Sequence, residues 1–268
     1  SRISLSNNDS GSMNTVFGYN AGANIGSGDN ENVFIGHNVG DADMTDAVEN
    51  VGMGANALTD LTTGDNNIAI GTKSLENLTA GGQNTAIGGY AMYRATTQSD
   101  ANVAIGYLAM SGNFTTADVN NCVVIGTDAM TGTLTTNASG SVAIGKQALE
   151  DLTDGAGNIA IGFQSAKGIT TGTNNTIIGY EALEDADGAE HNNTVIGFNA
   201  GKSINHDNAD NNVLIGKDAG KAGAAAFTQN VVIGVQALDG TSTAALEGCV
   251  VIGYQAGSAI DNTNSNGI

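Results

Sequence analysis

The sequence predicts an all-β protein, a parallel β-solenoid of about fourteen coils. A glycine recurs at intervals of 17 to 20 residues, β-branched residues precede it, and polar segments of variable length separate the repeats. A fixed period of this length is typical of a solenoid, in which each repeat buries its apolar side only by stacking on its neighbours. The repeated glycines are Gly18, Gly36, Gly54, Gly71, Gly88, Gly106, Gly126, Gly145, Gly162, Gly179, Gly197, Gly216, Gly234 and Gly253.

The residues before each glycine predict a short β-strand. With the glycine numbered zero, position −1 is Ile in twelve of fourteen repeats and position −3 is always Val, Ile or Thr. Side chains alternate between the two faces of a strand, so these two rows share one face. β-Branched residues at both positions favour a strand over a helix. We expect the −3 and −1 rows to fill the interior of the coil.

Position −2 is apolar as well, except at Gly52. Strands that are apolar on both faces are typical of parallel strands buried on both sides. A single coil has only one interior, so we expect the −2 row to form an exposed stripe that identical chains cover. The residues predicted for this oligomer interface are Val124, Val195, Leu214, Val232 and Val251.

The residues after each glycine predict a bend followed by a second short strand, whose small residue at +3 faces inward. Position +3 is Ala in eleven repeats, and position +2 is mostly polar. A glycine at the bend would allow unusual backbone dihedrals or a close backbone approach. The remaining segments are rich in Asp, Asn, Thr and Gly and predict edge loops. The glycines to which we assign this structural role include Gly71, Gly88, Gly106, Gly145 and Gly162.

Position −4 predicts a ladder of stacked asparagines. It is Asn in eleven repeats, and stacked side-chain amides can hydrogen-bond along the solenoid and to nearby backbone groups. Cys122, Ser141 and Cys249 are the exceptions. The two cysteines lie seven coils apart, too far for a disulfide within one chain, and are interpreted as small buried thiols. The asparagines assigned to the ladder include Asn67, Asn84, Asn102, Asn158 and Asn175.

Composition limits the partners and the domain organisation. The net charge is −19, from 27 acidic and 8 basic residues, which argues against nucleic acid or an anionic membrane as a partner. No apolar run is long enough to cross a bilayer. Only 4% of residues are aromatic, so the core should be thin. We expect a lead-in over residues 1–13, a repeat domain over 14–257, and a tail or link to a further segment over 258–268.

Candidate sites for chemistry are weak, and we predict that the protein is not an enzyme. His37, His191 and His206 occupy unrelated repeat positions and are interpreted as surface residues. Two acidic loops could offer oxygen ligands to Ca²⁺, the one cofactor considered, but their spacing matches no Ca²⁺-binding loop and favours solvated loops. Their residues are Asp41, Asp43, Asp46 and Glu49, and Glu184, Asp185, Asp187 and Glu190.

Aromatic residues recur at position +1. Such rings could pack at a seam between subunits or contact a receptor, and recurrence along the chain favours packing. The residues are Tyr19, Tyr107, Phe163, Tyr180, Phe198 and Tyr254.

Several repeats resemble those of known surface fibres. Segments 140–148 (GSVAIGKQA), 102–106 (NVAIG) and 84–88 (NTAIG) resemble the head repeats of YadA-like trimeric autotransporter adhesins. The longer unit, as in 67–84, looks still more like repeats of phage tail fibres and related virion appendages. The resemblance implies a left-handed β-roll joined as a homotrimer, on a virion appendage or extracellular surface, with other appendage proteins and a host receptor as partners.

The resemblance leaves three functions open. The expectation is a phage tail or capsid fibre segment involved in host attachment. The alternative is the head of a bacterial surface adhesin. A polysaccharide-degrading tail spike is the third, and the scarcity of aromatic residues disfavours it.

Overall fold

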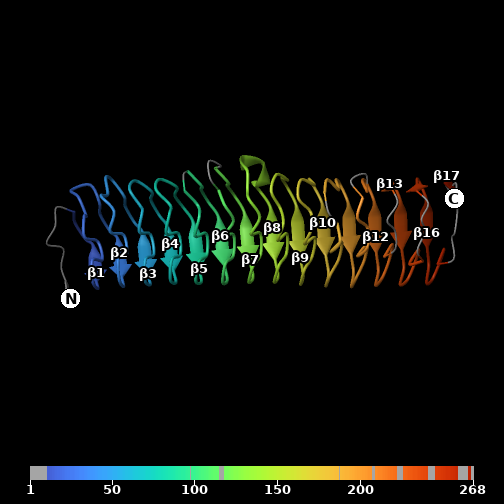
Figure 1. Cartoon of the computed structure of the whole chain (residues 1–268), viewed down its shortest axis with the longest axis horizontal. Coiled ribbons are helices and arrows are strands. Elements are labelled where there is room, and N and C mark those ends of the chain that lie inside the picture. Colours follow the sequence, from blue (N-terminus) through green and yellow to red (C-terminus); the bar gives the residue numbers. More distant parts are fainter. Residues whose placement is uncertain are drawn as a thin grey trace. The chain divides into compact units, whose positions relative to one another are not determined.

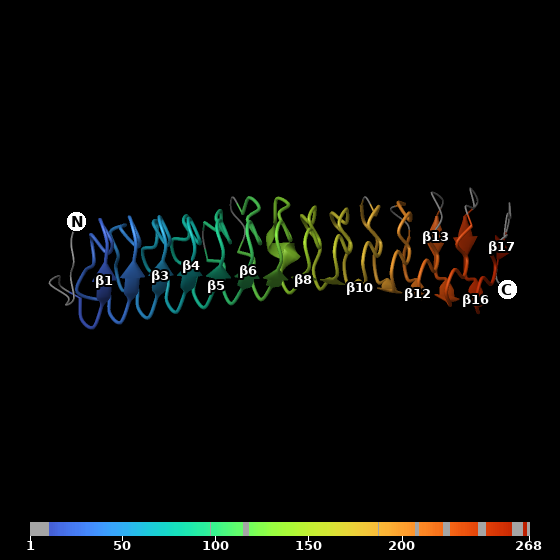
Figure 2. The same ribbon diagram turned by 90° about the horizontal axis from the view of Figure 1, so that it is seen from below.

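The computed structural model describes residues 11–96, 98–114, 118–186, 188–206, 209–221, 226–240, 245–258 and 265–266. The chain divides into two compact units, Ser1–Ser139 and Gly140–Ile268. In each unit short parallel strands stand side by side, joined by long loops that bring the chain back to the start of the next strand (Figures 1 and 2). The predicted parallel β-solenoid is therefore confirmed.

In the N-terminal unit each strand pairs in parallel with the next, and equivalent repeat positions lie opposite one another, as with Thr15 and Val33. One 3₁₀ turn, η1 (Thr136–Ala138), is the helical segment of the described residues, and none of these residues form a helix that could span a membrane. The strands are β1 (Thr15–Phe17), β2 (Val33–Ile35), β3 (Val51–Met53), β4 (Ile68–Ile70), β5 (Thr85–Ile87), β6 (Val103–Ile105) and β7 (Val123–Ile125).

The C-terminal unit repeats this pattern and adds a second, smaller sheet. Its main strands again pair in parallel with equivalent positions aligned. They are β8 (Val142–Ile144), β9 (Ile159–Ile161), β10 (Thr176–Ile178), β11 (Thr194–Ile196), β12 (Val213–Ile215), β14 (Val231–Ile233) and β16 (Val250–Ile252). The second sheet pairs β13 (Phe227–Thr228), β15 (Leu246–Glu247) and β17 (Ser265–Asn266).

The predicted second strand after each glycine is wrong. The described residues there form turns, and those at +2 and +4 have left-handed backbone conformations, for example φ of 61° at Tyr90 and 49° at Met92. Because residues with left-handed backbone conformations alternate here with residues of ordinary backbone conformation, the chain curls and does not extend as a strand. The small sheet of the C-terminal unit arises elsewhere, because its strands precede the −4 corner.

The repeated glycine is required for two reasons. Its φ lies between 131° and 148°, a region that side chains disfavour. A Cβ added at Gly71, Gly88 or Gly106 would also lie less than 3.0 Å from the carbonyl oxygen of the equivalent glycine in the next coil. Gly145 and Gly162 behave identically in the C-terminal unit. The predicted bend and close backbone approach are both confirmed.

The structure reverses the predicted facing of the strand. Side chains at −2 lie inside the coil, and those at −3 and −1 point outward, as the pattern around Ala104 in β6 shows. The interior is narrow and also receives the small residue at +3, as predicted, together with the residue at +4. The −2 row therefore forms the core, with Phe34, Ala69, Val124 and Leu214 all inaccessible to solvent.

In several coils positions −2 and +4 compensate for each other in volume. Where −2 is Ala, as at Ala69 and Ala104, position +4 is the larger Leu75 or Met110, and all four side chains are buried. Beside the large residues Phe34 and Leu214 at −2, position +4 is glycine, and a Cβ at Gly40 would lie 2.8 Å from Phe34 Cζ. Close packing of a thin core explains this exchange, since interiors tolerate neither voids nor excess volume.

The same argument explains the gap at Gly52. A Cβ there would lie 2.5 Å from Val39 Cγ1 and 3.1 Å from Phe34 Cδ1, so the neighbouring coil already fills the space.

The predicted asparagine ladder is confirmed, and each amide makes several bonds. In the N-terminal unit, Asn84 Nδ2 donates to Asn67 Oδ1 at 3.0 Å and to the Ser99 carbonyl of the next coil at 2.7 Å. Asn84 Oδ1 in turn accepts the backbone and side-chain N–H groups of Asn102. Asn158 and Asn175 form the same contacts in the C-terminal unit.

Residues that replace a ladder asparagine keep part of its bonding. The thiol of Cys122 lies 3.6 Å from the Ala138 carbonyl oxygen, the position that an Asn Nδ2 would contact. The Ser141 hydroxyl likewise donates to the Gly155 carbonyl at 3.3 Å. Both Cys122 and Cys249 are buried thiols, as predicted.

We predict that Gly88→Ala lowers the free energy of unfolding by about 2–4 kcal/mol, because the methyl group combines backbone strain with a collision against the next coil. Urea unfolding followed by circular dichroism measures this. Gly89→Ala is the matched control, since a Cβ there makes only an ordinary 3.4 Å contact with the Tyr107 ring. Equal effects of the two substitutions would contradict the prediction.

We predict that Asn84→Ala destabilises the fold by about 2–4 kcal/mol, because it leaves the buried Asn102 amide and Ser99 carbonyl without their partner. The same urea titration tests this. Asn137→Ala, at an exposed asparagine on η1, should change stability by no more than about 0.5 kcal/mol. A ladder substitution as mild as the control would show that the amides contribute little.

Candidate interaction surface

The outward rows at −3 and −1 form an apolar face on the strands of each unit. Because equivalent positions pair between strands, Ile stacks on Ile along the −1 row and Val, Ile or Thr along the −3 row. Their side chains are half-exposed or exposed, with 37% at Ile68, 50% at Val250 and 63% at Ile252. Monomeric proteins rarely expose contiguous apolar patches larger than a few hundred Å². This face is therefore the strongest candidate for a protein–protein contact.

The residues predicted for the oligomer interface do not lie on this face. Val124, Val195, Leu214 and Val232 are fully buried, and Val251 is 7% exposed. Their side chains occupy the interior of their own coils, so the interpretation of the −2 row as an exposed stripe is wrong. The prediction placed the uniform β-branched rows inside, whereas the narrow interior takes the −2 row, whose side chains vary in size from Gly to Phe.

Thr residues at −3 consequently lie outward and not in the core. The face holds Thr15, Thr85, Thr176 and Thr194 among Val and Ile. Four Thr residues among the −3 positions leave the face apolar in character.

Aromatic rings at +1 border this face in the C-terminal unit. Phe163, Tyr180 and Phe198 stack with centroids 5.0 and 5.3 Å apart and nearly parallel planes. The Lys217 ammonium lies 5.9 Å from the Phe198 centroid and continues the column. The rings therefore cover one another's faces and expose mainly their edges, which extends the apolar face sideways.

A charged network lies beside this column. Lys202 contacts the carboxylates of Glu181 and Glu184, the latter at 2.8 Å. The hydrogen bond from Lys202 lowers the pKa of Glu181 and raises that of Lys202, and the hydrogen bond with Glu181 raises the pKa of Tyr180. Because the charged side chains remain partly accessible to solvent, the network fixes side-chain positions more than it stabilises the fold.

The described residues of the acidic loops do not assemble into a cation site. Asp43, Asp46 and Glu49 are exposed, and burial is the main cause of a raised pKa at Asp41. In the second loop Glu184 is paired with Lys202, Asp185 is exposed and Glu190 is buried, while Asp187 lies outside the described residues. Across the described ranges, no three His, Cys, Asp or Glu side chains are placed to hold a metal ion.

A second side-chain ladder runs at position −6, which the sequence analysis missed. The side chain at −6 accepts the backbone N–H of the −6 residue in the preceding coil. Asp100 Oδ1 accepts from Gly82 at 2.7 Å, and Asn120 Oδ1 accepts from Asp100 at 2.6 Å. In the C-terminal unit His191 Nδ1 accepts from Thr173 at 3.0 Å. The recurrence of a short polar residue at −6 is the sequence signal that could have predicted this ladder.

The three histidines have different surroundings. His191 is half-buried and belongs to the −6 ladder, so its interpretation as a plain surface residue is incomplete. His37 is exposed and its ring stacks on Tyr19 at 5.3 Å. His206 is half-buried.

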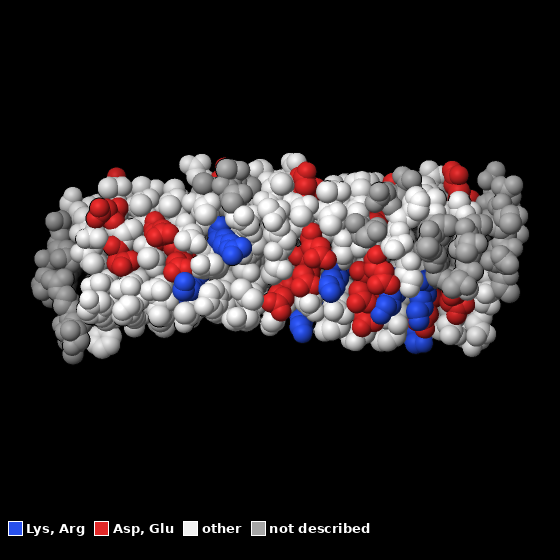
Figure 3. All heavy atoms as spheres, in the orientation of Figure 1, with Lys and Arg blue, Asp and Glu red and all other residues white. Residues whose placement is uncertain are grey.

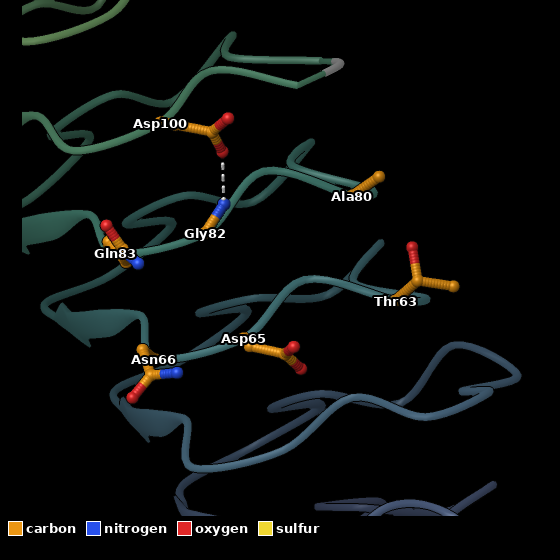
Figure 4. A pocket seen from close by; sticks show the side chains of 7 residues that line it. All are labelled: Thr63, Asp65, Asn66, Ala80, Gly82, Gln83 and Asp100. Atoms are coloured by element: carbon orange, nitrogen blue, oxygen red, sulfur yellow. Dashed lines mark hydrogen bonds between the residues drawn. The ribbon is translucent and has the colours of Figure 1, made fainter.

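A polar hollow of about 310 Å³ lies where the −6 ladder is interrupted in the N-terminal unit. Gly82 has no side chain to continue the ladder from Asp65, and Asp100 reaches its amide from the next coil (Figure 4). Asp65 Oδ1 accepts from the Val48 amide at 2.8 Å. The two carboxylates thus serve coil stacking, and the hollow follows from the missing side chain. Its lining comprises Thr63, Asp65, Asn66, Ala80, Gly82, Gln83 and Asp100.

No protein-family model, curated protein or solved structure matches this chain.

We predict that Val195→Asp unfolds the C-terminal unit or destabilises it by more than about 4 kcal/mol, because it buries an unpaired charge in the coil. Ile196→Asp, one residue further along the same strand, should leave the secondary structure intact because that side chain faces outward. Circular dichroism and urea unfolding of both variants provide the comparison. A milder effect at 195 than at 196 would contradict the observed facing.

Proposed function

We propose that this chain is a structural segment of a surface fibre, and that identical chains associate through the apolar face formed by the −3 and −1 rows. The observation that carries the proposal is the continuity of that face, since Ile or a β-branched residue occupies it in coil after coil. Surfaces of this kind are covered in stable assemblies. The role is mechanical extension and attachment.

The finer features of the proposal come from the resemblance to fibre repeats. They are a left-handed roll of about fourteen coils, a homotrimer, and a place on a phage tail or capsid fibre that attaches to a host surface. The alternative is that the chain belongs to the head of a bacterial trimeric adhesin. The net charge of −19 fits a surface that stays soluble while one face is apolar.

Light scattering of the purified chain tests the assembly. At micromolar concentration the wild type should have three times the chain mass of 26.8 kDa. Replacing Ile178, Ile196 and Ile215 together with Asp should yield monomers that keep the β-sheet circular dichroism spectrum, because three charges would enter the contact while each coil keeps its core.

The matched control adds the same charge elsewhere. Asn174, Asn192 and Asn211 are exposed at the −5 corner, where Asp also tolerates the left-handed backbone, so their triple replacement with Asp should leave the oligomer intact. A monomeric wild type would refute the assembly proposal.

A further inference from the structure

The two described basic residues of the N-terminal unit gather beside three tyrosines. Lys73 Nζ lies 5.2 Å from the centroid of Tyr93, and Arg94 Cζ lies 5.8 Å from the same ring. Tyr90 packs edge-on against Tyr93 at 5.5 Å and against Tyr107 at 6.0 Å. Basic side chains form only a few separate patches on the face drawn in Figure 3, so such a cluster stands out from the acidic surface.

The backbone fixes this tyrosine–arginine patch. The Tyr90 amide donates to the Thr72 carbonyl of the preceding coil at 2.8 Å, which holds the left-handed residue in place. Gly89 leaves position +1 without a side chain, and the Tyr107 ring leans over it, because an added Cβ there would contact Tyr107 Cδ2 at 3.4 Å. The Tyr107 ring therefore does not stack in a parallel aromatic column of the kind that Phe163 and Tyr180 form.

The charges of the patch differ in how far they are compensated. Lys73 forms an ion pair with Glu76 at 3.3 Å, whose hydrogen bond raises the pKa of Lys73. Arg94 is exposed, and within the described part of the chain its observed interaction is the contact with the Tyr93 ring. A guanidinium presents a planar pair of donors that matches a carboxylate. Arg94 can therefore bind an anion without first breaking an ion pair.

We propose that this tyrosine–arginine patch binds an acidic saccharide, with a carboxylate on Arg94 and a sugar ring against Tyr107. The C–H-rich face of a pyranose packs on an exposed aromatic ring, and Tyr107 is 52% exposed. Among the described residues the patch offers three tyrosine rings but a single cation without an ion pair, Arg94, whereas an acidic peptide would need several such cations for its carboxylates. These features favour a sugar over a peptide.

This inference rests on the proposed attachment function and names the class of receptor. Tyr90, Tyr93 and Arg94 lie at +2, +5 and +6, on the turn side of the coil and away from −3 and −1, whereas Tyr107 at +1 borders the apolar face. Because Arg94 lies outside the apolar face, Arg94→Gln tests the site without changing the assembly surface.

The test is titration of the wild-type chain with oligogalacturonate, followed by calorimetry and by tyrosine fluorescence, which is usable because the chain has no Trp and six Tyr. Arg94→Gln should weaken binding about tenfold or more, and Tyr107→Ala should do likewise. Tyr180→Ala and Lys217→Gln remove a similar ring and cation from the C-terminal unit and should leave the affinity unchanged.

Two further probes separate the alternatives. A neutral maltooligosaccharide and a poly-glutamate peptide should both bind at least tenfold more weakly than oligogalacturonate. Equal binding of poly-glutamate would overturn the saccharide assignment, and unchanged affinity of Arg94→Gln would overturn the site. Binding retained by the triple Asp variant of the −1 row would separate the site from the assembly. A wild-type chain that bound oligogalacturonate as a monomer would refute only the fibre proposal.

Discussion

Backbone contact between neighbouring coils is the constraint on which the rest of this structure depends. Repeated glycines such as Gly71 and Gly88 lie so close to the next coil that a single methyl group would collide with its carbonyl oxygen, and their φ of more than 130° excludes most other residues. The close approach aligns the strands in register, and register in turn stacks Asn on Asn at −4. The long polar loops can vary from 17 to 20 residues per repeat because they do not set this spacing.

The narrow interior then decides which side chains the coil can hold. A ring at Phe34 requires glycine at positions 40 and 52, and alanine at 69 allows leucine at 75. Asparagines can be buried at one corner of this core without leaving polar groups unsatisfied, because each amide oxygen and nitrogen has a hydrogen-bond partner in an adjacent coil. Stacking of equivalent residues in successive coils thus satisfies the buried polar groups and packs the apolar side chains at the same time.

The sequence alone predicted the solenoid, the glycine bend, the inward residue at +3 and the Asn ladder, because each follows from periodicity and from the chemistry of a single residue type. It failed on facing, since alternation along a three-residue strand identifies two faces but not which one is inside. The exchange of volume between −2 and +4 in some coils, as in Phe34 and Gly40, is only a partial signal of facing, because other coils, such as that of Ile177 and Leu183, hold large residues at both positions. The left-handed turn at Tyr90 and Met92 was missed because bulky residues rarely adopt positive φ. The tyrosine–arginine patch joins residues of different coils, so only the fold brings it together.

Coil stacking also determines where this protein can acquire a function. Positions −7 to −4, −2, zero, +3 and +4 hold the coil closed or contact the next coil, and a change there affects every neighbour. The outward side chains at −3 and −1 do not close the coil, yet these positions remain nearly uniform. Such uniformity is expected of a surface that contacts an equally regular partner. Positions +1, +2, +5 and +6 vary from coil to coil and carry most of the rings and cations, including Tyr107 and Arg94. A uniform face suits assembly along the whole chain, whereas a local departure such as Gly89 beside Tyr107 suits recognition at one place.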